Sequence, residues 1–485
     1  MQNSKLVQIF YALKPWKQVA LSKFVASPYF NKREDIIQLC AYLQQVDPEK
    51  NPKLLDQKLA YQYIYGAETP FESKKIRYAM SFLLQAIERF LAIEQLEEDE
   101  LQVHLSTAKA YRKLDLRKLY TKQMIKVNKI LEKEKARDLK WWECKYIVTQ
   151  EQFDYTVEQD RLEVQQLQQL SSIAVTLFIV KTLKHACRLL SYREVLEVEV
   201  DTNMVDVIVK HVESNPILLQ QPLIVLYYYY YKAIQRAEKS YDYFQKFKQE
   251  LLKAHHFLSK KELTRLYTLA VDYLGLTVAK LGAEKKYVAY EPYLMETLTL
   301  HKTALELDLF FDNENYFSHY AFVNIVYVGA KAKAYDWVRD FIMTYKDKLA
   351  PLNREVYARI CLARLEFALK NYKEVVLLLR DIESNYDLLS YIGIKILLLK
   401  TYYELKEFAL LESYLSSFEK LLYRKKKNIG EGAYRHHRGL IKLTKKLLTI
   451  RAYEKEQKQA FENTIVSSGV ALTLKEWLLE KLEEL

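Results

Sequence analysis

Glycine and proline are scarce in this chain, which has nine of each among its 485 residues. Together they make up roughly 4% of the sequence, against about 12% in average usage. Sandwiches, barrels and doubly wound sheets need many tight turns, so this composition disfavours all three. Half of the residues are hydrophobic and 28% are charged, which allows a large core and argues against disorder. The composition therefore predicts an all-α protein.

Cysteine and long apolar runs are also rare. The four cysteines stand singly, and the adjacent pairs His255-His256 and His436-His437 point about 100° apart on a helix, so neither predicts a metal site. The most apolar stretches, 173–180 and 223–231, have about half of the ~20 residues that span a bilayer. The start of the chain lacks the features of a signal peptide. We expect a soluble, cytoplasmic protein with no membrane partner, no metal and no cofactor.

Several common catalytic patterns are missing. The chain has no G-x-x-x-x-G-K-[ST] loop for nucleotide phosphates, no H-E-x-x-H metal pair and no G-x-S-x-G nucleophile elbow. Gly430-Glu431-Gly432 is not followed by the third glycine of a dinucleotide loop. The sequence therefore predicts that the protein is not an enzyme.

Apolar residues recur with the period of a helix, and the prolines suggest how the helices are grouped. In 77–93, one stripe contains Ala79, Phe82, Leu83, Ile87, Phe90 and Leu91. Five of the nine prolines lie in the first hundred residues, before the acidic run 97–100. We expect an N-terminal helical module at 1–100, irregular helical hairpins at 101–216, and a helical-repeat region at 217–485 that ends in an amphipathic capping helix.

The downstream region contains similar segments at a nearly constant interval. The clearest are 362–382 and 398–418, each an apolar helix, a polar corner and a second apolar helix. The corner aromatics Tyr335, Tyr372 and Phe408 are separated by 37 and 36 residues. A period of this size is typical of helical solenoids, in which each pair of helices buries its apolar face against its neighbours.

Residues 318–420 resemble the tetratricopeptide-repeat (TPR) family. The matching positions are the pairs Ile325-Val326 and Leu362-Ala363 in first helices, the corner residues Tyr335 and Asn371-Tyr372, the second-helix residues Val338 and Val375, and Pro351 between units. Larger residues replace the small ones that the family uses at Val326, Leu399, Val338, Val375 and Leu411, and we expect them to spread the helices. The resemblance implies a right-handed superhelix that binds proteins or peptides and carries no catalytic residues.

Tyrosine is unusually abundant, with 39 copies against 20 phenylalanines. Five stand together: Tyr227, Tyr228, Tyr229, Tyr230 and Tyr231. Rings with polar tips make good anchors for a partner, because they bury much area and lose little rotamer entropy. They also fill the seams between helices. For this run both hypotheses stay open.

Positive charge is concentrated in one segment. Residues 423–446 contain nine Lys or Arg against the single acid Glu431, which is +8 of the chain's net +12. The candidates for anion or nucleic-acid binding are Arg424, Lys425, Lys426, Lys427, Arg435 and Arg438, with Tyr423 and Tyr434 available to stack on bases. The two glycines favour a loop or a frayed helix end here. The alternative is a solvated helix face with favourable cations near a helix C-terminus.

Two functions of different classes follow from these features. The first is a non-enzymatic cytoplasmic scaffold that binds a protein or peptide through a helical-repeat surface. The alternative is an RNA- or DNA-associated factor that uses residues 423–446. The sequence leaves open the identity of the partner and whether the chain forms homo-oligomers.

Overall fold

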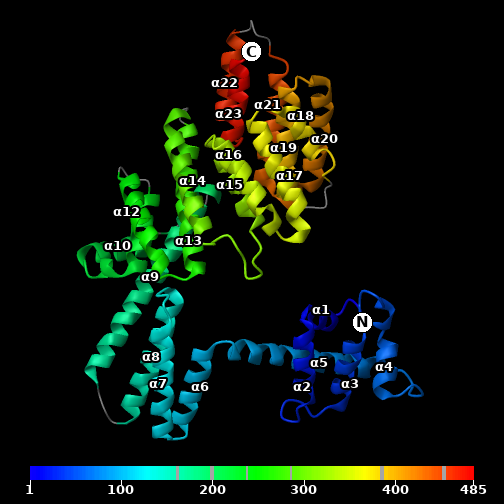
Figure 1. Cartoon of the computed structure of the whole chain (residues 1–485), viewed down its shortest axis with the longest axis vertical. Coiled ribbons are helices and arrows are strands. Elements are labelled where there is room, and N and C mark those ends of the chain that lie inside the picture. Colours follow the sequence, from blue (N-terminus) through cyan, green and yellow to red (C-terminus); the bar gives the residue numbers. More distant parts are fainter. Residues whose placement is uncertain are drawn as a thin grey trace. The chain divides into compact units, whose positions relative to one another are not determined.

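The computed structural model describes residues 1–159, 163–196, 201, 203–235, 239–283, 287–382, 387–450 and 455–485 (Figure 1). These residues form 23 α-helices and five short 3-10 helices, and no β-strand occurs within them. Phe317 makes isolated bridges to Phe311 and Leu349. The all-α prediction is confirmed. Because few glycines or prolines interrupt the chain, long stretches can form the regular i to i−4 backbone bonds of a helix.

The chain divides into two compact units. Unit 1 consists of Met1–Glu134 and Cys144–Leu167, and unit 2 of Lys135–Glu143 and Gln168–Leu485. Helices α8 (Leu139–Glu158) and α9 (Val164–Leu196) therefore have residues in both units. The expected boundaries near residues 100 and 216 stay predictions.

Unit 1 begins with a five-helix module built around one long helix. Its helices are α1 (Lys5–Ala12), α2 (Pro15–Ala26), α3 (Glu34–Gln45), α4 (Gln57–Tyr65) and α5 (Ser73–Glu97), and the first four all contact α5. The stripe expected on α5 buries Ala79, Leu83, Ile87 and Phe90. Phe82 was wrongly assigned to this stripe: its side chain is exposed, and the guanidinium of Arg33 lies 4.2 Å from its ring centre. A second group of helices follows, in which α6 (Glu100–Lys113) and α7 (Arg117–Lys133) pack against each other.

Unit 2 is a succession of helices with a core that continues from one group to the next. Its first helices after α9 are α10 (Asn203–Ser214), α11 (Pro222–Ile234), α12 (Ser240–Lys253), α13 (Lys260–Ala283) and α14 (Glu291–Glu306). They are followed by α15 (His319–Lys331), α16 (Tyr335–Tyr345), α17 (Pro351–Ala368), α18 (Tyr372–Leu379), α19 (Leu388–Glu404), α20 (Phe408–Ile429), α21 (Glu431–Leu447), α22 (Lys455–Ser467) and α23 (Leu472–Glu483). Ala304 and Leu305 of α14 belong to two successive hydrophobic clusters, and Leu398 and Leu399 of α19 to the next pair of clusters. The helices are therefore joined through shared layers.

Helices α15 to α20 form three hairpins of the same kind (Figure 1). The predicted corner residues Tyr335, Tyr372 and Phe408 are the first residues of α16, α18 and α20. Each of α16 and α18 packs against the first helix of its own hairpin and against the first helix of the next one. The first helices α15, α17 and α19 also contact each other in order. This arrangement supports the prediction of a helical-repeat fold.

The three hairpins share one turn geometry. Lys333, Lys370 and Lys406 end the first helices in the left-handed region, with φ of 58°, 64° and 59°. In each turn, the next residue's N–H donates to the carbonyl five residues earlier, over 2.8–3.0 Å. This is the Schellman pattern, which usually places glycine at the left-handed residue. This glycine-poor chain has lysine at that position, so no glycine in the sequence marks these turns.

The positions that carry the TPR resemblance are buried at equivalent places. Val326, Ala363 and Leu399 in first helices, and Val338, Val375 and Leu411 in second helices, are all fully buried. Gly329 of α15 shows how one larger residue is accommodated, since a Cβ added there would lie 2.5 Å from Cγ2 of Val338. A glycine on one helix therefore compensates for a valine on the other.

Candidate functional site

The tyrosine run lies on α11, which begins with Pro222 at its first position. Five successive residues of a helix together cover nearly every face of it. Helix α11 contacts both α12 and α13, so neighbouring helices cover more than one of its faces. Four of the tyrosines are buried, and only Tyr229 is partly exposed. The buried hydroxyls bond to Glu262 (Tyr227), Glu213 (Tyr228, 3.0 Å), Ser191 (Tyr230, 3.1 Å) and Asp206 (Tyr231, 3.0 Å). The structure thus places these four side chains in the seams between helices of unit 2.

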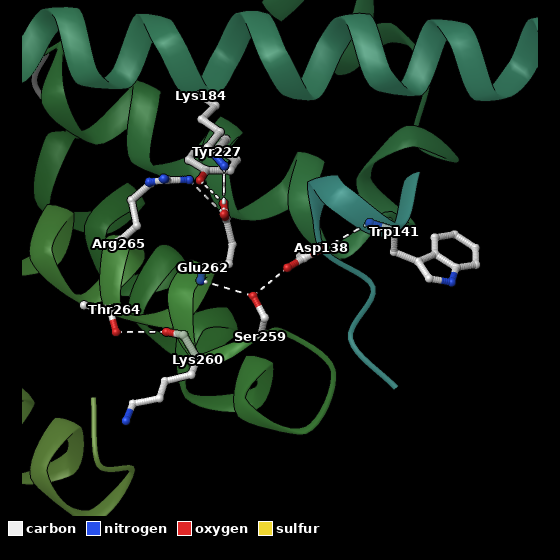
Figure 2. Close-up of polar contacts among 9 residues, drawn as sticks. All are labelled: Asp138, Trp141, Lys184, Tyr227, Ser259, Lys260, Glu262, Thr264 and Arg265. Carbon is white, nitrogen blue, oxygen red and sulfur yellow. Dashed lines mark hydrogen bonds and ion pairs between the residues drawn. The ribbon is translucent and has the colours of Figure 1, made fainter. Parts of the chain in front are cut away.

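Tyr227 leads to a buried charge cluster centred on Glu262 (Figure 2). The Lys184 ammonium of α9 donates to both carboxylate oxygens of Glu262, over 2.8 and 2.7 Å. Arg265, one turn along α13, donates to Oε2 over 3.0 Å, and the Tyr227 hydroxyl donates to Oε1. The Glu262 side chain is 5% exposed and that of Lys184 is 11% exposed. One carboxylate therefore joins three helices, α9, α11 and α13, inside the core.

The electrostatics of this cluster follow from its burial. Loss of solvent lowers the pKa of Lys184, while the adjacent Glu262 carboxylate works in the opposite direction. Burial and the same carboxylate both raise the pKa of Tyr227 well above its usual value, so its hydroxyl stays a hydrogen-bond donor. The Glu262 carboxylate thus accepts hydrogen bonds from three side chains, those of Lys184, Arg265 and Tyr227.

A second polar contact holds the start of α13 (Figure 2). Ser259 Oγ accepts from the backbone N–H of Glu262 over 3.3 Å and donates to Asp138 Oδ2 over 2.5 Å. Asp138 Oδ1 in turn accepts from the N–H of Trp141 in the first turn of α8. Two helix N-termini are therefore capped through one shared bond. Sequence reasoning missed this cluster: Ser259-x-x-Glu262 matches a capping box and marks a helix start, but does not reveal that the carboxylate is buried.

The basic segment lies on two helices joined at Gly430, so of the two structures that its glycines favoured, a loop or a helix end, the loop is wrong. The alternative of cations near a helix C-terminus is met by Lys426 and Lys427 in the last turn of α20. Arg424, Lys425, Lys426 and Lys427 continue α20 to Ile429. Gly430, with φ of 84°, forms the turn, and α21 begins at the next residue. A polar stretch can stay helical here because Leu422 of α20 and Tyr434, Leu440 and Ile441 of α21 are buried in one hydrophobic cluster. Packing therefore keeps the segments on both sides of Gly430 helical, and the turn is confined to that glycine.

The candidate cations are divided between a groove and other surfaces. Arg424 and Arg438 line one groove of about 680 Å³, together with Ser416, Ser417, Glu419, Lys420, Tyr423 and Tyr434. Lys426 instead pairs with Glu431 over 2.9 Å and lies over the ring of Tyr434. Lys425, Lys427 and Arg435 are exposed. Sequence reasoning missed Lys420, which precedes the basic run but lies one helical turn from Arg424.

A second groove lies on the first helices of the repeated hairpins. It has a volume of about 320 Å³ and is lined by Tyr320, Val323, Asn324 and Tyr327 of α15, Tyr357 and Arg364 of α17, and Ser390 of α19. Tyr320 and Tyr357, and likewise Tyr327 and Arg364, are 37 residues apart, the interval between the first two hairpins. Equivalent positions of successive hairpins therefore share one surface, which we name the first-helix face.

Comparison with protein-family models, with curated proteins and with solved structures finds no match to this chain. The TPR resemblance therefore rests on the residues named above. Among the helices that the structure describes, none is long and apolar enough to cross a membrane. Within the same residues, no three His, Cys, Asp or Glu side chains converge as a metal site would require.

Proposed function

We propose that this chain is a non-enzymatic, cytoplasmic scaffold that binds a protein or peptide on the first-helix face. We also propose that hairpins α15 to α20 form a TPR-like right-handed superhelix. The constant turn, the equivalent buried positions and the shared core layers support this geometry. Cys40, Cys187 and Cys361 are free thiols, which fits a reducing compartment.

The groove on the first-helix face carries the proposal. Tyr320 is 64% exposed, and the Arg364 guanidinium lies 6.0 Å from the ring centre of Tyr327. Among the described residues, Arg364 has no ion pair, so its charge is available to an acidic group of a ligand. Tyrosine and arginine are the residue types that contribute most often to the energy of protein interfaces.

Further along the first-helix face, a helix of the same chain, α23, packs against it. Lys331 lies one helical turn beyond Tyr327, and Lys400 is the counterpart of Arg364 in the next hairpin. Both contact α23: Glu476 pairs with Lys331 over 2.8 Å, and the Trp477 ring lies 5.5 Å from the Lys400 ammonium. Trp477 also donates its indole N–H to Glu404 over 2.9 Å. This contact supports a partner with an acidic, aromatic-containing segment for the open groove.

Site-specific photocrosslinking in cells tests the proposal. A photoreactive phenylalanine analogue replaces Tyr320, which lines the groove. The matched control has the analogue at Tyr78 of α5, which is 54% exposed and lies in unit 1. Lysates are treated with nuclease before mass spectrometry, so that proteins joined through nucleic acid are removed.

The expected result is one discrete set of crosslinked proteins at Tyr320 that is absent at Tyr78. Arg364→Ala should reduce these crosslinks while leaving the melting temperature almost unchanged, because the guanidinium has no ion pair among the described residues. Equal crosslinking at the two positions, or no protein crosslinked at Tyr320, would contradict binding on this face.

A further inference from the structure

The groove between α20 and α21 combines cations on both walls with one exposed ring. On α20, Lys420 and Arg424 are one helical turn apart, and on α21 Arg438 lies on the opposite wall. Tyr423, next to Arg424, has a side chain that is 72% exposed. We infer that this groove binds single-stranded nucleic acid, with the cations on its phosphates and Tyr423 stacked on a base.

The rows of positive charge continue beyond the groove along both helices. Lys427 follows Arg424 by three residues on α20, and Lys442 follows Arg438 by four residues on α21. Residues three or four apart lie on the same helix face. Arg435 precedes Arg438 by three residues in the same way, so the row on α21 covers about 10 Å. A row of this length matches a chain of phosphates better than a single phosphate group.

The acid in the groove does not cancel this charge. Glu419 pairs with Lys445 over 2.8 Å and with Arg438 over 3.4 Å. These neighbours, Lys445 first, lower the pKa of Glu419, so its carboxylate is already compensated within the protein. On α20, the helix that also carries Glu419, the side chains of Lys420 and Arg424 have no ion pair among the described residues. The groove therefore keeps a net positive charge.

The exposure of Tyr423 indicates which form of nucleic acid fits the groove. Tyr423 is exposed, whereas Tyr434 at the floor is buried and has the Lys426 ammonium 4.9 Å from its ring centre. An exposed ring beside cations can stack on an unpaired base, which a duplex does not offer. Arginine adds planar contacts to phosphate and to bases. These features favour a single strand over duplex nucleic acid.

Another helix of the same chain provides a matched control. On α7, Lys122, Lys126 and Lys129 are exposed and have the same spacing as Lys420, Arg424 and Lys427. Replacing either triplet by glutamate changes the net charge by the same amount. None of the three α7 lysines lines a groove described above, so the comparison separates the groove from overall charge.

The experiment measures fluorescence anisotropy of a labelled 15-nucleotide RNA of mixed sequence with the full-length protein. Wild type should bind, and four phosphate contacts should weaken binding about 50-fold between 50 and 200 mM salt. The reversal of Lys420, Arg424 and Lys427 should abolish binding, whereas the α7 reversal should change it less than about threefold. Tyr423→Ala should weaken binding roughly fivefold or more, since stacking contributes at that level per base. Circular dichroism melts confirm that each variant is folded.

Four outcomes would overturn the inference. They are absence of RNA binding by wild type at 50 mM salt, equal losses in the two charge-reversed variants, duplex RNA binding as tightly as the single strand with no effect of Tyr423→Ala, and binding of a doubly phosphorylated peptide in place of RNA. The last result would assign the groove to a phosphoprotein.

Discussion

Replacing Glu262 by glutamine perturbs the buried cluster at its centre. Glutamine keeps the shape of the side chain and can still accept a bond from Tyr227, but removes the carboxylate that pairs with Lys184 (Figure 2). Asp138, whose charge also favours the protonated form of Lys184, is unchanged in the variant. Arg265 is 37% exposed and can turn toward water. Lys184 is 11% exposed and cannot. The loss of stability should therefore come mainly from an unpaired ammonium on α9.

The size of this loss can be bounded from the pKa of Lys184. Without Glu262 the ammonium either stays buried and charged or releases its proton. From the reference pKa of 10.5, releasing it at pH 7 costs about 5 kcal/mol, at about 1.4 kcal/mol per pH unit. Breaking a buried ion pair by removing one partner typically costs about 3–5 kcal/mol. We expect Glu262→Gln to destabilise unit 2 by about 3–5 kcal/mol at pH 7.

The same reasoning gives the direction of the pH dependence. In the variant, folding depresses the pKa of Lys184 below its unfolded value, so the unfolded chain binds one more proton than the folded chain. Stability of the variant should then rise with pH, relative to wild type, up to about pH 10.5. Between pH 7 and pH 9 the difference in unfolding free energy should narrow by about 3 kcal/mol.

Urea denaturation followed by circular dichroism measures the free energy, and hydrogen exchange of peptides from α9, α11 and α13 shows whether the loss is local to them. Adding Lys184→Met should recover most of the stability, because the unpaired ammonium is then gone. A loss below about 1 kcal/mol at pH 7, or a difference that does not change with pH, would refute this account.

Three further predictions concern other parts of unit 2. The methyl group of Gly329→Ala should clash with Val338 and lower the free energy of unfolding by about 1–3 kcal/mol. In a double-mutant cycle, Val338→Ala should relieve that clash, so strictly additive losses of stability would contradict the packing. Tyr230→Ala should lower stability by about 3–5 kcal/mol and Tyr229→Ala by much less, as compared in melts, because only the former is fully buried. Burial lowers the pKa of His301 to about 4, so stability should fall by about 3 kcal/mol as pH drops from 6.5 to 4, and urea titrations of His301→Phe should show a smaller fall.

Composition and periodicity were enough to predict the helices and where the hairpins turn. Tyr335, Tyr372 and Phe408 begin second helices because a recurring apolar pattern has to bury the same faces in each unit. The buried places of Val338 and Val375 follow from the same pattern. These properties depend on residues that are close to one another in the sequence, so they can be inferred from the sequence directly.

The surfaces depended on neighbours that are distant in sequence. The tyrosine run could not be assigned from sequence, because burial of Tyr230 requires α9 and burial of Tyr227 requires both α9 and α13. The glycines near residue 430 favour a loop or a frayed helix end, whereas packing of Leu422 and Ile441 keeps both flanking segments helical up to the turn at Gly430. The sequence by itself thus determined the helical class, the hairpin period and the local excess of positive charge. Only the tertiary structure decided which side chains face one another, because a helix exposes or buries a residue according to what packs against that face.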